Sequence, residues 1–177
     1  MDSEWKEIFN GNDLTGWQMR HADREHAWVA HEGILENTKH AVDIITEDEF
    51  GDFDLHIEYL FPEGSNSGIY LRGRYELQIL DSLGNTYDYP AENAAIYNFK
   101  RVDVEATKPA GEWQIMDVNL VGMVVTVDLN GQRVHDTVTL ENPTGGQLFN
   151  DNEPSGPLML QGDHGPVSFR NIRIREL

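Results

Sequence analysis

The segment from Asn66 to Asp81, NSGIYLRGRYELQILD, constrains the fold more than any other part of the chain. It has the pattern of a hairpin, with strands over 67–72 and 75–81 and a tight turn at Gly73-Arg74. Successive side chains of a strand point to opposite faces, so this hairpin has one apolar and one polar face. The polar face carries Tyr70, Arg72, Glu76 and Gln78, and the apolar face carries Ile69, Leu71, Leu77 and Ile79. The polar face is either an ordinary solvated surface or, given these residue types, a surface that binds a polyol.

The segment 53–61, FDLHIEYLF, is the clearest alternation of apolar and polar residues in the chain. Consecutive strands usually lie side by side, so we expect His56 and Glu58 to join the polar face of the hairpin. Glu58 and Glu76 would then lie about 5–10 Å apart, which brackets the separations used in glycoside hydrolysis. In the alternative, Arg72 pairs with one of these carboxylates and forms only a salt bridge.

The remaining chain predicts an all-β protein. About a dozen short strands are separated by turn signals, the strongest being Asn130-Gly131, and no long helix is indicated. In the last strand, Arg170-Asn171 breaks the alternation and indicates a bulge. Residues 82–111 lack a period but contain several aromatic residues, so we expect a loop folded over one edge of the polar face. We predict one antiparallel sandwich or barrel domain over residues 1–177.

Composition excludes several classes of function. The 177 residues include no cysteine, so disulfides, thiol catalysis and zinc–thiolate sites are absent. The formal net charge is −18, and without a basic stripe nucleic acid is a poor candidate partner. No apolar run approaches the ~20 residues that span a bilayer. The start, MDSEWKEIFNG, lacks the basic and apolar regions of a signal peptide.

The seven histidines are scattered, and their spacing does not indicate a metal site. His56 lies two residues from Glu58 in a predicted strand, and His164 follows Asp163 in a short loop. Either histidine could act as a general base or acid beside carboxylates on a concave face. Structural or surface histidines are the simpler interpretation. The residues alone leave the metal requirement undetermined.

Four segments together resemble the 3-keto-disaccharide hydrolase family. They are NGNDLTGW, FGDFDLHIEYLFPEGSNSGIYLRGRYELQILD, GEWQIMDVNLVGMVVTVDLNGQRV and LMLQGDHGPVSFRNIRIREL, and they cover nearly the whole chain. The resemblance implies a concanavalin A-like jelly roll, in which two antiparallel sheets form a sandwich with a sugar-sized groove on one sheet. It also implies a periplasmic or secreted location. One departure is GDHG, where a shorter join is expected, and this affects the placing of His164.

The resemblance implies cleavage of glycosides whose sugar ring carries a ketone at C3. Such a ketone acidifies the C2 proton, so a base can form an enolate that expels the group at C1. The candidate bases are His56, His164, Glu58 and Glu76. Arg72 or a bound divalent cation would hold the enolate oxygen, although no cofactor is required with certainty. The groove residues implied by the family are Glu58, Arg72, Glu76, Gln78, Gln161 and His164.

Two other functions fit the same sequence. A non-catalytic carbohydrate-binding module would depend mainly on stacking aromatics such as Trp17, Trp113, Tyr87 or Tyr97. An ordinary two-carboxylate glycosidase would act on unoxidised sugars. In each case the expected partner is a small-molecule sugar, and the candidate substrate-binding residues are Tyr70, Arg72, Gln78, Trp113 and Gln161. The oligomeric state is not predicted.

Overall fold

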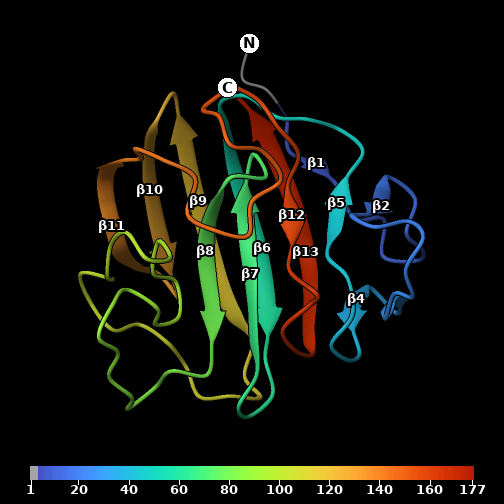
Figure 1. Ribbon diagram of the computed structural model, residues 1–177, viewed down its shortest axis with the longest axis horizontal. Helices are drawn as coiled ribbons and strands as arrows, with labels where there is room; N and C mark the ends of the chain where they lie inside the picture. The colour runs from blue at the N-terminus through green and yellow to red at the C-terminus, as the bar shows by residue number, and fades with distance from the viewer. Residues whose placement is uncertain (1–3) are drawn as a thin grey trace.

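The computed structural model describes residues 4–177, which form two antiparallel sheets (Figure 1). The eight-stranded sheet contains, in spatial order, β11 (Gln132–Thr139), β10 (Val124–Leu129), β9 (Gln114–Val121), β6 (Phe53–Leu60), β13 (Val167–Glu176), β4 (Ile34–Asn37) and β3 (Trp28–His31), and β1 (Lys6–Glu7) also pairs with β13. The five-stranded sheet contains β2 (Trp17–Met19), β5 (Ile44–Thr46), β12 (Met159–Leu160), β7 (Asn66–Leu71) and β8 (Tyr75–Leu80). The predicted all-β sandwich is confirmed.

The core lies between the two sheets, where their apolar faces meet. The alternation in β6 buries Phe53, Leu55, Ile57 and Tyr59, and the β7–β8 hairpin buries Ile69, Leu71, Leu77 and Ile79. Side chains from both sheets belong to one hydrophobic cluster, as expected for a face-to-face sandwich. The opposite side chains of each strand therefore form the two outer faces.

Two predicted irregularities are present where the sequence indicated them. Asn130 and Gly131 both have positive φ angles, 51° and 79°, and connect β10 to β11 in the manner of a tight hairpin. The register of β13 against β6 shifts between Arg170 and Arg173, and Asn171 has a φ of 49°. This bulge re-aims the Asn171 side chain toward β6.

The predicted adjacency of the 53–61 segment and the hairpin is wrong. β6 lies between β9 and β13 in the eight-stranded sheet, whereas β7 and β8 belong to the five-stranded sheet. The connection at residues 61–65 carries the chain from one sheet to the other, and Figure 1 shows β7 in front of β6. Because the inner faces form the core, His56 and Glu58 lie on the outer face of the eight-stranded sheet, away from the hairpin's polar face.

The hairpin turn begins one residue earlier than predicted. Arg72 and Gly73 have φ angles of 51° and 64°, and the Arg74 amide donates to the Leu71 carbonyl at 3.0 Å. These are the features of a turn with two left-handed central residues. Arg72 is therefore a turn residue, so the strand alternation does not extend to its side chain.

Arg72 links the two sheets rather than facing outward with Tyr70. Its guanidinium donates to the carbonyls of Gly51 and Gly122, at 2.9 and 2.7 Å, and pairs with Asp52 at 3.0 Å. Those three partners lie at the ends of strands in the eight-stranded sheet, and Arg72 is only 1% exposed. The expectation that Arg72 contacts a ligand is corrected: its side chain fastens the hairpin tip to the opposite sheet.

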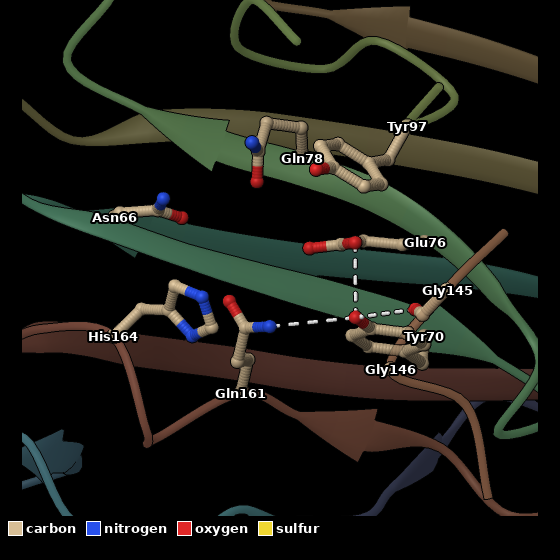
Figure 2. A pocket seen from close by; sticks show the side chains of 9 residues that line it. All are labelled: Asn66, Tyr70, Glu76, Gln78, Tyr97, Gly145, Gly146, Gln161 and His164. Atoms are coloured by element: carbon tan, nitrogen blue, oxygen red, sulfur yellow. Dashed lines mark hydrogen bonds between the residues drawn. The ribbon is translucent and has the colours of Figure 1, made fainter. Parts of the chain in front are cut away.

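The long segment 82–111 covers the free edge of β8, as predicted. Backbone hydrogen bonds join Ala94 and Ala95 to Gln78, at 2.7 and 2.9 Å, and Tyr97 to Glu76 at 3.0 Å. This pairing brings the Tyr97 side chain to the polar face of the hairpin (Figure 2). Among residues 4–177, no helix is long and apolar enough to cross a membrane.

The position of Arg72 predicts a large loss of stability when its side chain is shortened. Arg72→Met leaves two carbonyl acceptors without their donor, and each unsatisfied buried group costs about 1–3 kcal/mol. We therefore expect urea denaturation to show an unfolding free energy lower by about 2–4 kcal/mol. The matched control is Arg133→Met, because Arg133 pairs with Asp128 on an exposed surface and should contribute less than about 1 kcal/mol. Equal, small effects of both changes would contradict the structural role.

Candidate functional site

A pocket of about 300 Å³ opens on the outer face of the five-stranded sheet (Figure 2). It is lined by Asn66, Tyr70, Glu76, Gln78, Tyr97, Gly145, Gly146, Gln161 and His164. These residues come from β7, β8, the loop over the edge of β8, the loop after β11 and the turn after β12. Five predicted site residues are thus brought together: Tyr70, Glu76, Gln78, Gln161 and His164.

The floor of the pocket follows from the register of β7 and β8. Tyr70 lies opposite Glu76, and Gly68 lies opposite Gln78. The missing side chain of Gly68 provides the space for the Glu76 carboxyl group. A Cβ at this position would lie 2.2 Å from Glu76 Oε1, which is well inside contact distance. Glycine is required here for space, not for an unusual backbone angle.

The Tyr70 hydroxyl connects Glu76 to a backbone carbonyl. Its oxygen lies 2.9 Å from Glu76 Oε2 and 3.0 Å from the Gly145 carbonyl. A hydroxyl has one proton, so it cannot donate to both acceptors. If Glu76 is protonated, Glu76 donates to Tyr70, and Tyr70 donates to Gly145. When the Glu76 carboxyl group is neutral, the Tyr70 hydroxyl and the Gly145 carbonyl therefore both have a hydrogen-bond donor.

The electrostatic environment favours the same protonation state. Glu76 is 3% exposed, and burial raises the pKa of its carboxyl group to about 8. The hydrogen bond from Tyr70 acts in the opposite direction, and the negative charges of Asp43 and Asp163 raise the pKa further. Burial and the neighbouring Glu76 also raise the pKa of Tyr70. At neutral pH the pocket thus contains a carboxylic acid.

Two glutamine amides complete the floor. The Gln78 amide is oriented so that its nitrogen donates to the Ser67 carbonyl at 2.9 Å and to Glu76 Oε1 at 3.3 Å. Gln161 donates from Nε2 to the Tyr70 oxygen at 3.4 Å. Its Oε1 is buried and has no hydrogen-bond partner among the described residues. Because such an acceptor is costly to leave unpaired, Gln161 Oε1 is suited to accept a hydrogen bond from a hydroxyl group of a ligand.

His164 forms one wall of the pocket, opposite Glu76 and beside Gln161 (Figure 2). Its Nδ1 lies 2.5 Å from Oδ1 of the adjacent Asp163. A histidine that donates from Nδ1 to a carboxylate carries its lone pair on Nε2. With Nδ1 donating to Asp163, the imidazole Nε2 can accept a proton, and the GDHG join is compatible with a place in the pocket.

Four other predicted site residues lie outside the pocket. Glu58 accepts from Arg170 and Asn171 at 2.6 and 2.7 Å, and His56 lies 2.7 Å from Asp117. Burial raises the pKa of Glu58, but the hydrogen bonds from Asn171 and Arg170 and the positive charge of Arg170 outweigh this effect, so the pKa is lowered overall. The ring of Trp113 stacks under Arg170, 4.0 Å from the guanidinium carbon. This cluster belongs to the eight-stranded sheet, and the fourth residue, Arg72, is buried between the sheets.

The pocket residues that sequence reasoning missed are Asn66, Gly145 and Gly146. Gly145 and Gly146 have φ angles of 124° and 71°, and a Cβ on Gly146 would lie 2.6 Å from the Tyr70 oxygen. The paired glycines in the 142–155 loop were the available signal, but they do not show which side chain the loop approaches. Tyr97 was predicted only as a stacking aromatic of a binding module.

The divalent cation considered from the sequence remains a prediction. Within residues 4–177, no three histidine, aspartate or glutamate side chains are grouped so that they could hold a metal ion. The pocket has Glu76 and His164 as ionisable side chains suited to proton transfer. Glu76 and His164 are therefore the two side chains through which the pocket can transfer protons.

The space left by Gly68 predicts a specific steric effect. Gly68→Ala should displace the Glu76 carboxyl group and lower the unfolding free energy by about 1–3 kcal/mol, as overpacking does. Gly51→Ala is the matched control, since its Cβ would meet the Pro154 carbonyl at an ordinary 3.7 Å. We expect a change within about 0.5 kcal/mol for that control. Indistinguishable denaturation curves for both variants would show that Glu76 does not occupy the position described.

The raised pKa of Glu76 predicts how stability changes with pH. The folded protein retains a proton between the ordinary value of 4.5 and about 8, where the unfolded chain loses it. Stability should therefore fall across this window relative to Glu76→Gln, by at most about 1.4 kcal/mol per pH unit. Below 4.5 and above 8 the difference between the two proteins should be constant. Urea denaturation at several pH values measures it, and a difference independent of pH would contradict the raised pKa.

Comparison with known proteins identifies the family. The sequence matches the 3-keto-alpha-glucoside-1,2-lyase-like domain over residues 4–175. A crystal structure from Parabacteroides distasonis ATCC 8503, of a protein provisionally named a glycosyl hydrolase, is 30% identical, with a TM-score of 0.82. The match covers 98% of this chain and 84% of that one. No curated protein matches the sequence significantly.

More distant solved structures share the fold alone. The Bacillus licheniformis beta-glucanase is 13% identical, with a TM-score of 0.61 and coverage of 100% of this chain and 99% of that one. The carbohydrate-binding module CBM66 from Bacillus subtilis is 14% identical, with a TM-score of 0.59 and coverage of 92% and 97%. The sandwich thus has the fold of these proteins, a concanavalin A-like jelly roll, and the chain belongs to the family of 3-keto-alpha-glucoside-1,2-lyase-like domains.

Proposed function

We propose that this protein cleaves the glycosidic bond of 3-keto-glycosides by elimination across C1 and C2. The observation that carries the proposal is the juxtaposition of Glu76 and His164 in one pocket, the first as a buried carboxylic acid and the second as an imidazole held by Asp163 at Nδ1. An elimination needs both an acid and a base. The two environments suit Glu76 to act as the acid and His164 to act as the base. Membership of the family supports the choice of a 3-keto sugar.

In the first step, His164 Nε2 removes the proton from C2 of the sugar. The C3 ketone receives the electron pair, and the resulting enolate has a C2–C3 double bond. Asp163 holds the imidazole through Nδ1 and stabilises the imidazolium that forms. In an unoxidised sugar the C2 proton has no adjacent carbonyl group, so the same base would be ineffective.

In the second step, the enolate returns to the ketone while a C1–C2 double bond forms and the C1–oxygen bond breaks. Glu76 donates its proton to the departing oxygen, which leaves as an alcohol. The ionised Glu76 then accepts hydrogen bonds from Tyr70 and Gln78, at 2.9 and 3.3 Å, so both states of the carboxyl group are hydrogen-bonded. The products are a 1,2-unsaturated 3-keto sugar and the leaving group.

The remaining pocket groups suit the recognition of a sugar ring. Gln161 Oε1 can accept a hydrogen bond from a ring hydroxyl, and Tyr97 offers an aromatic wall beside the floor. Hydrogen bonds to these groups would hold C2 near His164 and the leaving oxygen near Glu76. A volume of about 300 Å³ lies at the lower end of the range of small-molecule sites.

The second candidate function is a carbohydrate-binding module without catalysis. The observation that favours it is the structural likeness to CBM66, together with the amide and tyrosine side chains of the pocket. Binding alone would not need a carboxyl group with a raised pKa or an oriented histidine. The two-carboxylate glycosidase loses its structural basis, because Glu58 and Glu76 lie on different sheets.

The proposal is tested with two 3-keto-glucosides that differ in the leaving group, methanol in one and 4-nitrophenol in the other. His164→Ala should lose about 10²–10⁴-fold in rate with both substrates, because it removes the base. Glu76→Gln should lose a similar factor with the methyl glycoside but much less with nitrophenol, which needs no acid. Above pH 8 the wild-type rate on the methyl glycoside should decline as Glu76 ionises.

His56→Ala and Glu58→Gln are the matched controls, since they remove the same residue types from the outer face of the other sheet. Both should cleave at close to the wild-type rate. Sugar binding without cleavage of either ketoglycoside would favour the binding module. Equal losses for Glu76→Gln with both leaving groups would reject Glu76 as the acid.

A further inference from the structure

Two pocket segments are joined by an ion pair, Arg20 with Asp43, whose members do not line the pocket themselves. Asp43 is 4% exposed, and its Oδ1 accepts from the Gly162 amide at 2.9 Å. Its Oδ2 accepts from Arg20 Nη1 at 3.0 Å. The same guanidinium donates to the carbonyls of Gly146 and Gln147, at 2.7 and 2.9 Å. Arg20 and Asp43 therefore join the turn after β12 to the loop after β11.

Each of these segments carries a group that the proposed chemistry requires. Gly162 is two residues before His164, whereas Gly145 accepts the hydrogen bond from Tyr70 that completes the chain from Glu76. The loop after β11 is fixed on either side of this point by the Thr144 and Leu148 amides, which donate to the hairpin turn at 3.1 and 2.8 Å. Between these anchors, Arg20 holds two consecutive carbonyls of the segment 145–147.

We propose that Arg20 and Asp43 are positioning residues that set the distance between His164 and the Glu76–Tyr70 pair. This inference rests on the proposed function, since it concerns the same pocket. One buried carboxylate and one guanidinium fix both segments at once. Loss of Arg20 releases the segment 145–147 directly, and it leaves Asp43, which holds the Gly162 amide, buried without its charge partner.

The charge of Asp43 has a second effect on the pocket. The ionisable side chains that face Glu76 or act on it through space are Tyr70, Tyr97, His164, Asp43 and Asp163. Among these, the negative charges of Asp43 and Asp163 both raise the pKa of Glu76. An uncharged residue at position 43 should therefore make Glu76 ionise at lower pH. A residue that only maintained the fold would not shift this titration.

The test uses Arg20→Met and Asp43→Asn in the full chain. The controls are Arg133→Met and Asp128→Asn, which remove the same charges from an ion pair on the opposite sheet. Without substrate, hydrogen exchange should become about 10-fold faster in segments 145–147 and 162–164 for Arg20→Met. Carbon-13 NMR titration should show the Glu76 pKa lowered by about one unit in Asp43→Asn. Neither control should change these quantities.

With the methyl 3-keto-glucoside, kcat should fall about 10- to 100-fold in Arg20→Met, with a smaller change in KM, because misplaced groups lose transition-state contacts. Unchanged exchange in both segments, or an unchanged Glu76 titration, would overturn the positioning role even if the wild type cleaves the substrate. If no protein cleaves it, the proposed function fails, and the exchange and titration data still decide the role of Arg20 and Asp43.

Discussion

The pairing register of β7 and β8 is the constraint on which the pocket depends. Tyr70 lies opposite Glu76 and Gly68 opposite Gln78, so one set of side chains fills the core while the other forms the floor. A shift by one residue would exchange the two faces and bury the polar groups. The apolar face fixes the register because it packs against the eight-stranded sheet. Stability of the sandwich and geometry of the pocket therefore have the same origin.

The floor also shows how a sheet surface can contain a carboxylic acid at neutral pH. Glu76 is surrounded by Tyr70, two glutamine amides and the open face of Gly68, and no described cation lies within salt-bridge distance of it. Glu58, on the opposite sheet, has Arg170 and Asn171 as donors, and its pKa is lowered. Two glutamates on outer strand faces thus acquire opposite protonation behaviour from their neighbours, which strand alternation does not distinguish.

Alternation within each strand was the part of the structure that the sequence predicted well. It identified the all-β class, the core faces of β6, β7 and β8, the turn at Asn130-Gly131 and the bulge at Asn171. It also placed Tyr70, Glu76 and Gln78 together, because they belong to one hairpin. These features depend on residues that are close in sequence, where periodicity and turn chemistry act directly.

Apart from the one-residue shift of the hairpin turn, the errors concern contacts between segments that are distant in sequence. Nothing in Pro62 to Ser65 shows that the chain changes sheets there, so His56 and Glu58 were expected beside the hairpin. Arg72 was assigned to the polar face because the turn was expected at Gly73-Arg74. The turn lies at Arg72-Gly73, so the strand alternation does not extend to the Arg72 side chain. The contributions of Gly145 and Arg20 arise from loop packing over more than 70 residues of chain, for which a single sequence has no periodic signal.

Elimination requires that the C2 proton of the 3-keto sugar is removed before the glycosidic bond breaks. The most direct measurement uses methyl 3-keto-glucoside carrying deuterium at C2, with mass spectrometry of the released sugar. If the bond breaks by elimination, the deuterium is lost to solvent, whether the product is the unsaturated sugar or its hydrated form. Release of 3-keto-glucose that retains deuterium at C2 would show direct hydrolysis and contradict the elimination.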